Sequence, residues 1–159
     1  MKNLFNTSFG VKLDATEVAK AIVDFMAQEQ NFFYKVIIGS DSLRLADNSA
    51  DFVTAVVVHR VGNGGRYFWR RLEIKKFYTL RDRIINEVLM SIEVAQNVLR
   101  ELKSLGAVNF DFEIHADIGE NGATKSMIQE VVGMIRAYNF EVKTKPDSYA
   151  ASKVADRHV

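Results

Sequence analysis

The sequence contains no cysteine, a single proline and no long apolar run among its 159 residues. Without cysteine, the chain cannot form disulfides, thiolate zinc sites or a cysteine nucleophile, so any bound metal must be held by oxygen atoms or by histidine. No apolar stretch approaches the roughly 20 residues that span a bilayer, and residues 1–6 lack the apolar core of a signal peptide. We therefore expect a cytoplasmic protein without a membrane segment.

An excess of charge of one sign is absent as well. The 21 basic and 20 acidic residues give a formal net charge of +1, which neither favours nor excludes nucleic acid as a partner. With 48% hydrophobic and 26% charged residues, the composition is that of an ordinary globular protein. A chain of this length buries roughly 70% of its unfolded surface around one core. We expect residues 1–159 to form a single domain.

Hydrophobic periodicity predicts five strands and four helices, which is an α/β fold. The strands are expected at residues 32–40, 52–60, 66–75, 110–116 and 140–144, and the helices at residues 16–28, 79–104 and 123–138 and from residue 146 onward. Asn63, Gly64 and Gly65 tolerate positive φ and suit a hairpin turn, so the first three strands should form an antiparallel meander. Strands that are connected through helices prefer right-handed parallel crossovers. The first, fourth and fifth strands should therefore run parallel in a five-stranded mixed sheet, with one extra helix before it.

Two aspartates follow buried strands of this expected sheet. Asp41 comes after residues 36–40 (VIIGS), and Asp117 comes after residues 110–116. Ligands of such sheets collect at the carboxyl ends of the parallel strands. If the first and fourth strands are neighbours, the two acids meet there. The alternative is that each acid only caps a loop.

Glu87 is a third acid in an unusual place. It lies at the edge of the apolar stripe of the helix at residues 79–104, and a carboxylate that faces the core needs a cationic partner. An edge salt bridge is the alternative explanation. Three converging carboxylates repel one another by roughly 4 kcal/mol per pair at about 4 Å and an effective dielectric of about 20, unless a cation binds. Oxygen ligands favour Mg²⁺ or Mn²⁺ over zinc, and phosphoester cleavage by two such ions is the natural chemistry.

The C-terminal part supplies a fourth candidate acid. Asp147 follows Pro146 and is most simply a helix N-cap, whereas Asp156 lies further along the same expected helix, where it either completes the cluster or faces solvent. Four other polar side chains are candidate substrate contacts: Ser42, His115, Lys145 and His158. A buried structural role for His115 and simple exposure of His158 are the alternatives. Residues 66–71 mix bases with aromatics and suit a nucleic-acid contact, or else form an edge strand with one packed face.

Four segments carry a resemblance to a known family. They are IGSDS (residues 38–42), RIINE (residues 83–87), IHADIGENGAT (residues 114–124) and KPDSYAASKVADRH (residues 145–158). Together with the order of elements, they resemble the ribonuclease H-like superfamily and, more narrowly, its YkuK-like family, which has no known function. The superfamily shares a βββαβαβα core and carries acids on the first strand, the first core helix, the fourth strand and the last helix.

The resemblance implies that Asp41, Glu87 and Asp117 are metal-binding carboxylates, and that Asp156 matches the fourth acid better than Asp147 does. In the resulting hypothesis Asp41 bridges two ions of Mg²⁺ or Mn²⁺. Glu87 and Asp117 hold one of these ions, and Asp156 holds the other, in a nuclease that hydrolyses phosphodiester bonds. The chain lacks the extra basic substrate-handling segment of some ribonuclease H enzymes. Specificity for RNA–DNA hybrids therefore does not carry over.

Two other classes of function compete with the nuclease. A non-catalytic module would keep the fold and the acids and bind nucleic acid or protein without turnover. An ATP-dependent actin-like domain shares the core of the superfamily but needs a second lobe, and the short chain counts against it. The sequence leaves open whether a substrate is RNA, DNA or a hybrid, whether cleavage is internal or from an end, and how many subunits assemble.

Overall fold

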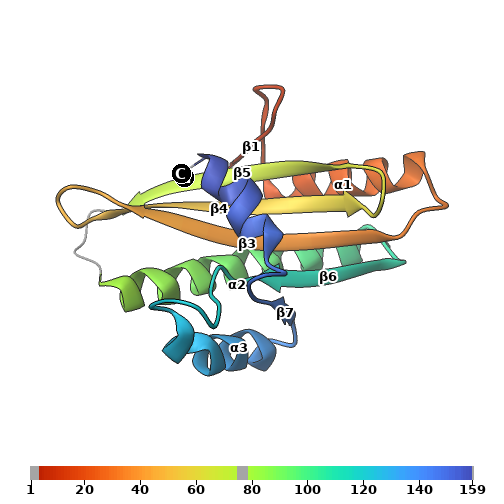
Figure 1. Cartoon of the computed structure of the whole chain (residues 1–159). Helices are drawn as coiled ribbons and strands as arrows, with labels where there is room; N and C mark the ends of the chain where they lie inside the picture. Colours follow the sequence, from red (N-terminus) through yellow and green to blue (C-terminus); the bar gives the residue numbers. More distant parts are fainter. Residues whose placement is uncertain (1–3, 75–78, 159) are drawn as a thin grey trace.

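A computed structural model of the chain describes residues 4–74 and 79–158, except for the side chains of residues 151, 152 and 156 (Figure 1). The strands are β1 (Phe5–Asn6), β2 (Lys12–Leu13), β3 (Tyr34–Arg44), β4 (Ala50–Arg60), β5 (Gly65–Ile74), β6 (Phe110–His115) and β7 (Glu141–Lys143). The helices are α1 (Ala15–Gln28), α2 (Leu80–Ser104), the 3₁₀-helix η1 (Lys125–Met127), α3 (Ile128–Ala137), the π-helix η2 (Ala150–Ala155) and α4 (Asp156–His158). The last position of the predicted third strand, Lys75, lies outside the described residues.

The described strands form one seven-stranded sheet in the order β2-β1-β5-β4-β3-β6-β7. The expected number of five strands is therefore wrong. β1 and β2 precede α1, and strands of two residues are too short to show a hydrophobic period. The rest of the expected topology is confirmed: β3, β4 and β5 form an antiparallel meander, β6 pairs in parallel with β3, and β7 pairs in parallel with β6.

Two of the differences in extent from the prediction change where the candidate acids lie. β3 continues to Arg44, because its antiparallel pairing with β4 runs on to the Arg44↔Ala50 pair. Asp41 therefore lies inside a strand rather than directly after one. The last helical segment begins later than Pro146, with η2 at Ala150, and it is wound as a π-helix before it continues into α4.

Side-chain caps set where the long helices begin. The Asp14 carboxylate accepts a hydrogen bond from the Glu17 amide at the start of α1, at 2.9 Å. The Thr79 hydroxyl accepts one from the Asp82 amide at the start of α2, at 3.1 Å. In both helices the carboxylate three residues later accepts a hydrogen bond from the backbone amide of the cap residue, which makes a capping box. These caps fix the phase of each helix and therefore which side chains face the sheet.

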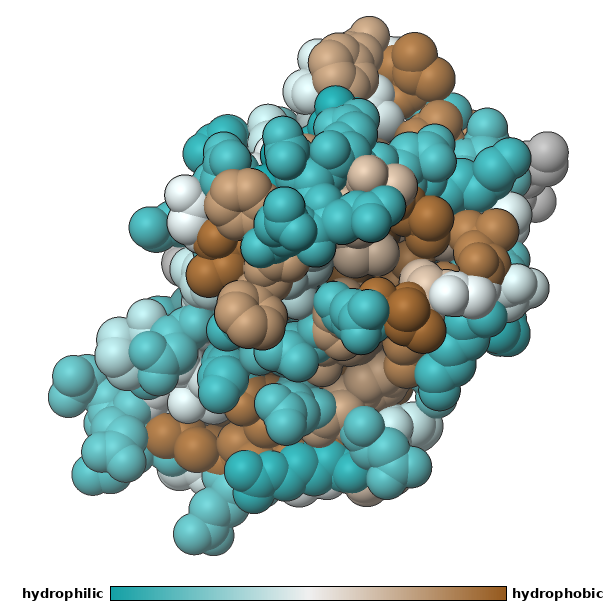
Figure 2. All heavy atoms as spheres, turned by 90° about the vertical axis from the view of Figure 1, so that its right-hand side faces the viewer, coloured by the Kyte–Doolittle hydropathy of each residue, from teal (hydrophilic) through white to brown (hydrophobic). Residues whose placement is uncertain are grey.

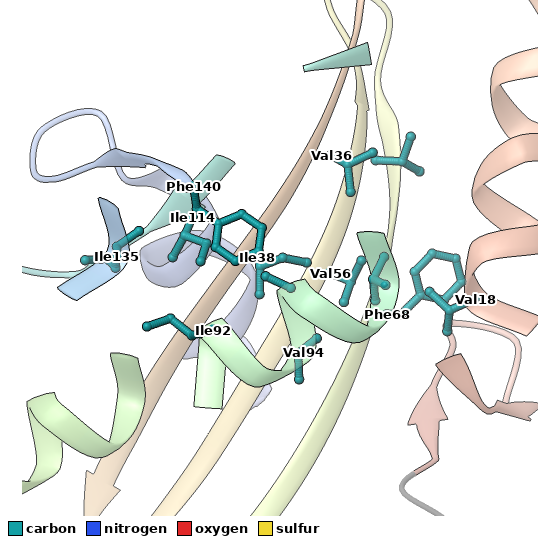
Figure 3. Packing of buried hydrophobic residues seen from close by; sticks show 14 of the residues in the cluster. Val18, Val36, Ile38, Val56, Phe68, Ile92, Val94, Ile114, Ile135 and Phe140 are labelled. Carbon is teal, nitrogen blue, oxygen red and sulfur yellow. The ribbon is translucent and has the colours of Figure 1, made fainter. Parts of the chain in front are cut away.

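The main core lies between the sheet and α1, α2 and α3 (Figure 3). Val36 and Ile38 of β3 and Val56 of β4 point into it and are fully buried, because alternate residues of a strand share one face. They meet Val18 from α1 and Ile92 from α2. Each fully buried aliphatic side chain of this size contributes roughly 1.5–3 kcal/mol to folding.

The opposite face of the sheet is covered by the C-terminal segment. Ile37 packs against Ala150 at the start of η2, and Val53 and Ala55 pack against Ala155 at its end. In Figure 1 this segment crosses in front of β3 and β4, whereas α1 and α2 lie behind the sheet. Small alanine side chains allow the helical backbone to approach the strands closely.

The two ends of the sheet differ in character. Phe33 and Val108, in the loops before β3 and β6, are 85% and 70% exposed. Figure 2 views this end and shows apolar surface scattered among hydrophilic side chains. The carboxyl ends of β3 and β6 lie at the other end, on the left in Figure 1. In the described part of the chain, no helix has the length and apolar character needed to cross a membrane.

We expect Ile114→Ala to lower the free energy of unfolding by about 2–5 kcal/mol. Ile114 is 1% exposed in the main core, so truncation leaves a cavity. Leu89→Ala, at a position of α2 that is 46% exposed, is the matched control and should change the value by less than about 0.5 kcal/mol. Denaturant unfolding followed by circular dichroism measures both. Equal losses in the two variants would contradict this description of the core.

Candidate functional site

The candidate site lies where the pairing of β6 with β3 ends and the two strands separate. The parallel pairing of these strands ends at the Gly39↔His115 pair, whereas β3 stays paired with β4 through Asp41↔Val53. Asp41 and Asp117 each lie two residues beyond the last parallel pair. The expectation that the two strands are neighbours is confirmed. The two acids therefore flank the point at which the chain turns away from the sheet.

Glu87 of α2 is bound to the end of β3 by a hydrogen bond. Ser42 Oγ donates to Glu87 Oε2 at 2.5 Å. Arg83 donates to Ser42 Oγ at 3.1 Å and to the Ser42 carbonyl at 2.9 Å. Arg83 is the cationic neighbour that Glu87 requires, and its position one helical turn before Glu87 is the signal that identifies it in the sequence. Ser42 is 6% exposed, and its hydroxyl orients Glu87 in the free protein. Its contact with a substrate stays a prediction.

A second set of hydroxyls fixes α2 on β3. Ser40 Oγ lies 2.7 Å from Ser91 Oγ and 2.8 Å from Thr54 Oγ1, and all three residues are buried. Ser40 and Ser42 are two residues apart on a strand, a separation of about 6.8 Å. Glu87 and Ser91 are four residues apart on a helix, a separation of about 6 Å. Because the two separations match, the strand and the helix bind each other at two successive points.

The environment of Glu87 opposes its ionisation. The pKa of Glu87 is raised from an ordinary 4.5 to about 8, chiefly by burial and in smaller part by the charges of Asp41 and Asp117. The hydrogen bond from Ser42 and the charge of Arg83 act in the opposite direction but do not outweigh burial. The charges of both aspartates act on the pKa of Glu87, so these carboxylates from three parts of the chain are close enough to interact electrostatically.

Asp117 has Lys145 as its cationic neighbour. Lys145 Nζ lies 3.3 Å from Asp117 Oδ1, and the lysine side chain is 54% exposed. Asp117 Oδ1 is itself buried and accepts no hydrogen bond from the residues that the structure describes. The Lys145 amide donates to the Ile118 carbonyl at 2.8 Å, and a Cβ at Gly119 would lie only 2.9 Å from Lys145 Cβ. The loop after β6 therefore holds Lys145 beside Asp117 and needs glycine to do so.

Glu87 and Asp117 line the same small cavity between α2 and the sheet. Ser40, Ser91 and His115 are the other polar residues in its wall. Its volume of about 10 Å³ is near the lower limit at which a cavity holds one water molecule. The two acids thus converge from different elements on a polar space that is too small for a substrate.

The acids converge without forming a coordination shell. Within the side chains that the structure describes, no three aspartates, glutamates or histidines are grouped to hold a metal ion. The side chain of Asp156, the expected fourth acid, lies outside the described part. Its backbone starts α4 directly after Ala155, which packs against Val53, the cross-strand neighbour of Asp41. Asp147, the alternative acid, is exposed in the turn after β7.

His115 is part of a buried network and not of an open site. It is 1% exposed, and its Nε2 donates to Glu113 Oε1 at 2.8 Å, which lowers the pKa of Glu113. This tautomer follows because His115 Nδ1 accepts a hydrogen bond from the Ala150 amide at 3.3 Å. In this structure the buried structural role is the one that His115 performs, and its contact with a substrate stays a prediction. The burial of His115 allows it to fasten β6 to the start of η2.

His158 lies over β5 and not in the wall of the Glu87 cavity. Its ring stacks on Trp69, with ring centres 3.8 Å apart and planes at 10°. Arg71 donates a hydrogen bond to the His158 carbonyl. Of the four expected substrate contacts, Lys145 and His158 remain accessible, and they lie in different places.

Comparisons with known proteins agree with this fold. A family model described as Ribonuclease H-like matches residues 17–159. A relative from Bacillus subtilis (strain 168), named Uncharacterized protein YkuK, is 30% identical over 165 residues, with 97% of this chain and 95% of the relative covered. The catalytic domain of Mos1 transposase, solved with raltegravir and Mg, matches 80% of this chain and 58% of its own with a TM-score of 0.32 and 9% identity. That last likeness is too distant to carry an argument.

We expect metal-free protein to lose stability as the pH rises from about 5 to about 8. The pKa of Glu87 is about 8 in the folded protein against 4.5 ordinarily, so the folded state binds the proton more tightly. The stabilisation is complete below the unfolded pKa and is lost as the pH passes through the folded one. Glu87→Gln should flatten this dependence.

Unfolding free energies measured in EDTA across this pH range test the expectation. Glu93→Gln, at an exposed acid of the same helix, is the matched control and should keep the wild-type slope. A slope that Glu87→Gln leaves unchanged would contradict the role of Glu87.

Proposed function

We propose that this chain, which belongs to the ribonuclease H-like family and within it to the YkuK-like group, is a divalent-metal-dependent nuclease that hydrolyses phosphodiester bonds of nucleic acid. The observation that carries the proposal is the convergence of Glu87 and Asp117 on one cavity, with Asp41 close enough to raise the pKa of Glu87. The ions would be Mg²⁺ or Mn²⁺, two of them with substrate bound. The cytoplasmic location expected from the sequence belongs to the same proposal.

The donor set supports this choice of metal. Asp41, Glu87, Asp117 and Asp156 would hold the ions, and carboxylate oxygens are the ligands that hard divalent cations prefer. Among the described residues, Asp117 Oδ1 is buried without a hydrogen bond and has Lys145 Nζ at 3.3 Å, so a metal ion would take the place of the lysine as its positive partner. The charges of Asp41 and Asp117 that help to raise the pKa of Glu87 also favour a cation there, because a cation stabilises the ionised carboxylates. When bound, the metal lowers the pKa of an attacking water and stabilises charge on the leaving oxygen.

The chain's own side chains position the acids and the substrate. Ser42 and Arg83 hold Glu87 against the end of β3. Continuous pairing with β4 keeps Asp41 rigid. Lys145 Nζ is half-exposed beside Asp117, from where it is able to turn to a substrate phosphate. The same lysine therefore compensates Asp117 in the free protein and contacts the backbone of bound nucleic acid.

A non-catalytic module that binds nucleic acid or protein is the second candidate. The observation that favours it is the ion pair between Lys145 and Asp117, because an amine at 3.3 Å already supplies positive charge to this carboxylate. Such a module would retain the acids as structural charges. Hydrolysis assays separate the two candidates.

We expect Asp41→Asn to lower metal-dependent hydrolysis by at least about 100-fold, since a bound metal contributes several kcal/mol of transition-state stabilisation. EDTA should abolish hydrolysis by the wild-type protein. The assay follows labelled single-stranded RNA, single-stranded DNA, duplexes and hybrids with Mg²⁺ or Mn²⁺ on denaturing gels. Asp24→Asn, at an exposed aspartate of α1, is the matched control and should keep the wild-type rate.

Two results would overturn the nuclease proposal. One is the absence of cleavage of every substrate by the wild-type protein, which would favour the binding module. The other is cleavage that Asp41→Asn does not reduce, since this would indicate a contaminating nuclease.

A further inference from the structure

A second group of polar and aromatic residues lies on the sheet face that carries Asp41. An open cleft of about 390 Å³ is lined by Asn6, Trp69, Arg71, Arg157 and His158. We name it the aromatic cleft. It is formed by β1, β5 and α4, and none of its residues belongs to the cavity at Glu87.

Three rings are grouped here: Trp69 and His158 line the cleft, and Tyr67 lies beside both. Trp69 and His158 are stacked with centres 3.8 Å apart, and the Tyr67 ring centre lies 5.7 Å from each of them. The Arg157 guanidinium lies 5.8 Å from the centre of the Tyr67 ring. Nucleobases stack on such rings whatever their sequence, because every base has a π-face.

Two arginines place positive charge beside these rings. Arg71 is 53% exposed, and its Nε lies 3.2 Å from Asp51 Oδ2. It also donates to the His158 carbonyl, so its guanidinium is fixed in place. Arg157 is exposed. Arginine pairs well with phosphate through its planar set of donors, so the cleft combines a stacking surface with backbone contacts.

The register of the sheet relates the cleft to the acids. Asp41 lies opposite Val53, and Val53 lies opposite Arg71. Directly opposed residues share one face of a sheet, and two strand spacings amount to about 10 Å. α4 begins between Asp41 and Arg71, because Ala155, the residue before α4, packs against Val53. A nucleic-acid chain that passes Asp41 therefore reaches the aromatic cleft within a few nucleotides.

We propose that the aromatic cleft binds an unpaired segment of nucleic acid, with a base stacked on the rings and phosphates on Arg71 and Arg157. The segment is unpaired because a base stacks on a side chain only after it has left its own helix. This inference rests on the proposed function and deepens it. Single-stranded nucleic acid is then the class of substrate that the aromatic cleft positions beside Asp41.

Fluorescence tests the proposal directly, because Trp69 is the single tryptophan of the chain. The titration is carried out in EDTA with a short single-stranded oligonucleotide and with a duplex of the same sequence. The single strand should quench the Trp69 emission and the duplex should leave it nearly unchanged. Two phosphate contacts give a slope of about −1.4 in a plot of log affinity against log salt concentration.

Variants of the lining residues test whether the single strand binds at the aromatic cleft. Trp69→Ala should weaken binding of a dye-labelled strand, followed by anisotropy, by at least about fivefold. Arg157→Gln should reduce the magnitude of the salt slope by about 0.7. Arg100→Gln, at an exposed arginine of α2, is the matched control and should bind as the wild type does. Trp69 also packs beside Ala55, so Arg157→Gln carries the test if Trp69→Ala does not fold.

Three results would overturn the proposal: unchanged Trp69 emission with single strands, equal quenching by the duplex, or equal effects of Arg100→Gln and Arg157→Gln. The last result would indicate general attraction between charges. Because binding is read in EDTA, these failures leave the nuclease proposal standing. A protein that binds single strands and cleaves none would instead refute only the nuclease proposal.

Discussion

The hydrogen bonds between β3 and α2 are the interaction on which the site depends. Ser40 bonds to Ser91 and Ser42 bonds to Glu87, so two hydroxyls of a strand engage two successive turns of a helix. This pairing sets the position of α2 along β3 and holds an acid against the strand. It also explains why polar side chains occupy a strand that is otherwise apolar on this face: a buried hydroxyl is stable only when it is hydrogen-bonded.

The acids come from both faces of the sheet, and two of them, Glu87 and Asp117, line one cavity beside the point where β3 and β6 separate. Glu87 approaches from the face of α2, whereas Asp41 shares the face of Ile37 by strand alternation. Asp117 lies beyond the last pair of β6, where the chain turns toward the cavity. The result is a set of carboxylates that repel one another, which Lys145 compensates in part and which a divalent cation would compensate better.

The C-terminal segment connects this set of acids to the rest of the same sheet face. The Ala150 amide bonds to the buried ring of His115, and Ala155 packs against Val53, so the segment is anchored at both ends of η2. α4 then carries His158 onto Trp69. One short segment therefore covers this face of the sheet, starts α4 at Asp156 beside Val53 and completes the aromatic cleft. A change at any of these contacts affects all three.

The sequence by itself determined the main elements, their parallel and antiparallel pairing and the neighbourhood of Asp41 and Asp117. Hydrophobic period and capping residues such as Thr79 are local properties, and the preference for right-handed crossovers turns their order into a topology. Only the tertiary structure decided the short β1 and β2, the extension of β3, the π-helical winding of η2, the burial of His115 and the link from Arg83 through Ser42 to Glu87. The physical reason is that a local pattern tells which face of an element is buried, whereas the partner of each buried polar group depends on elements that are distant in the chain.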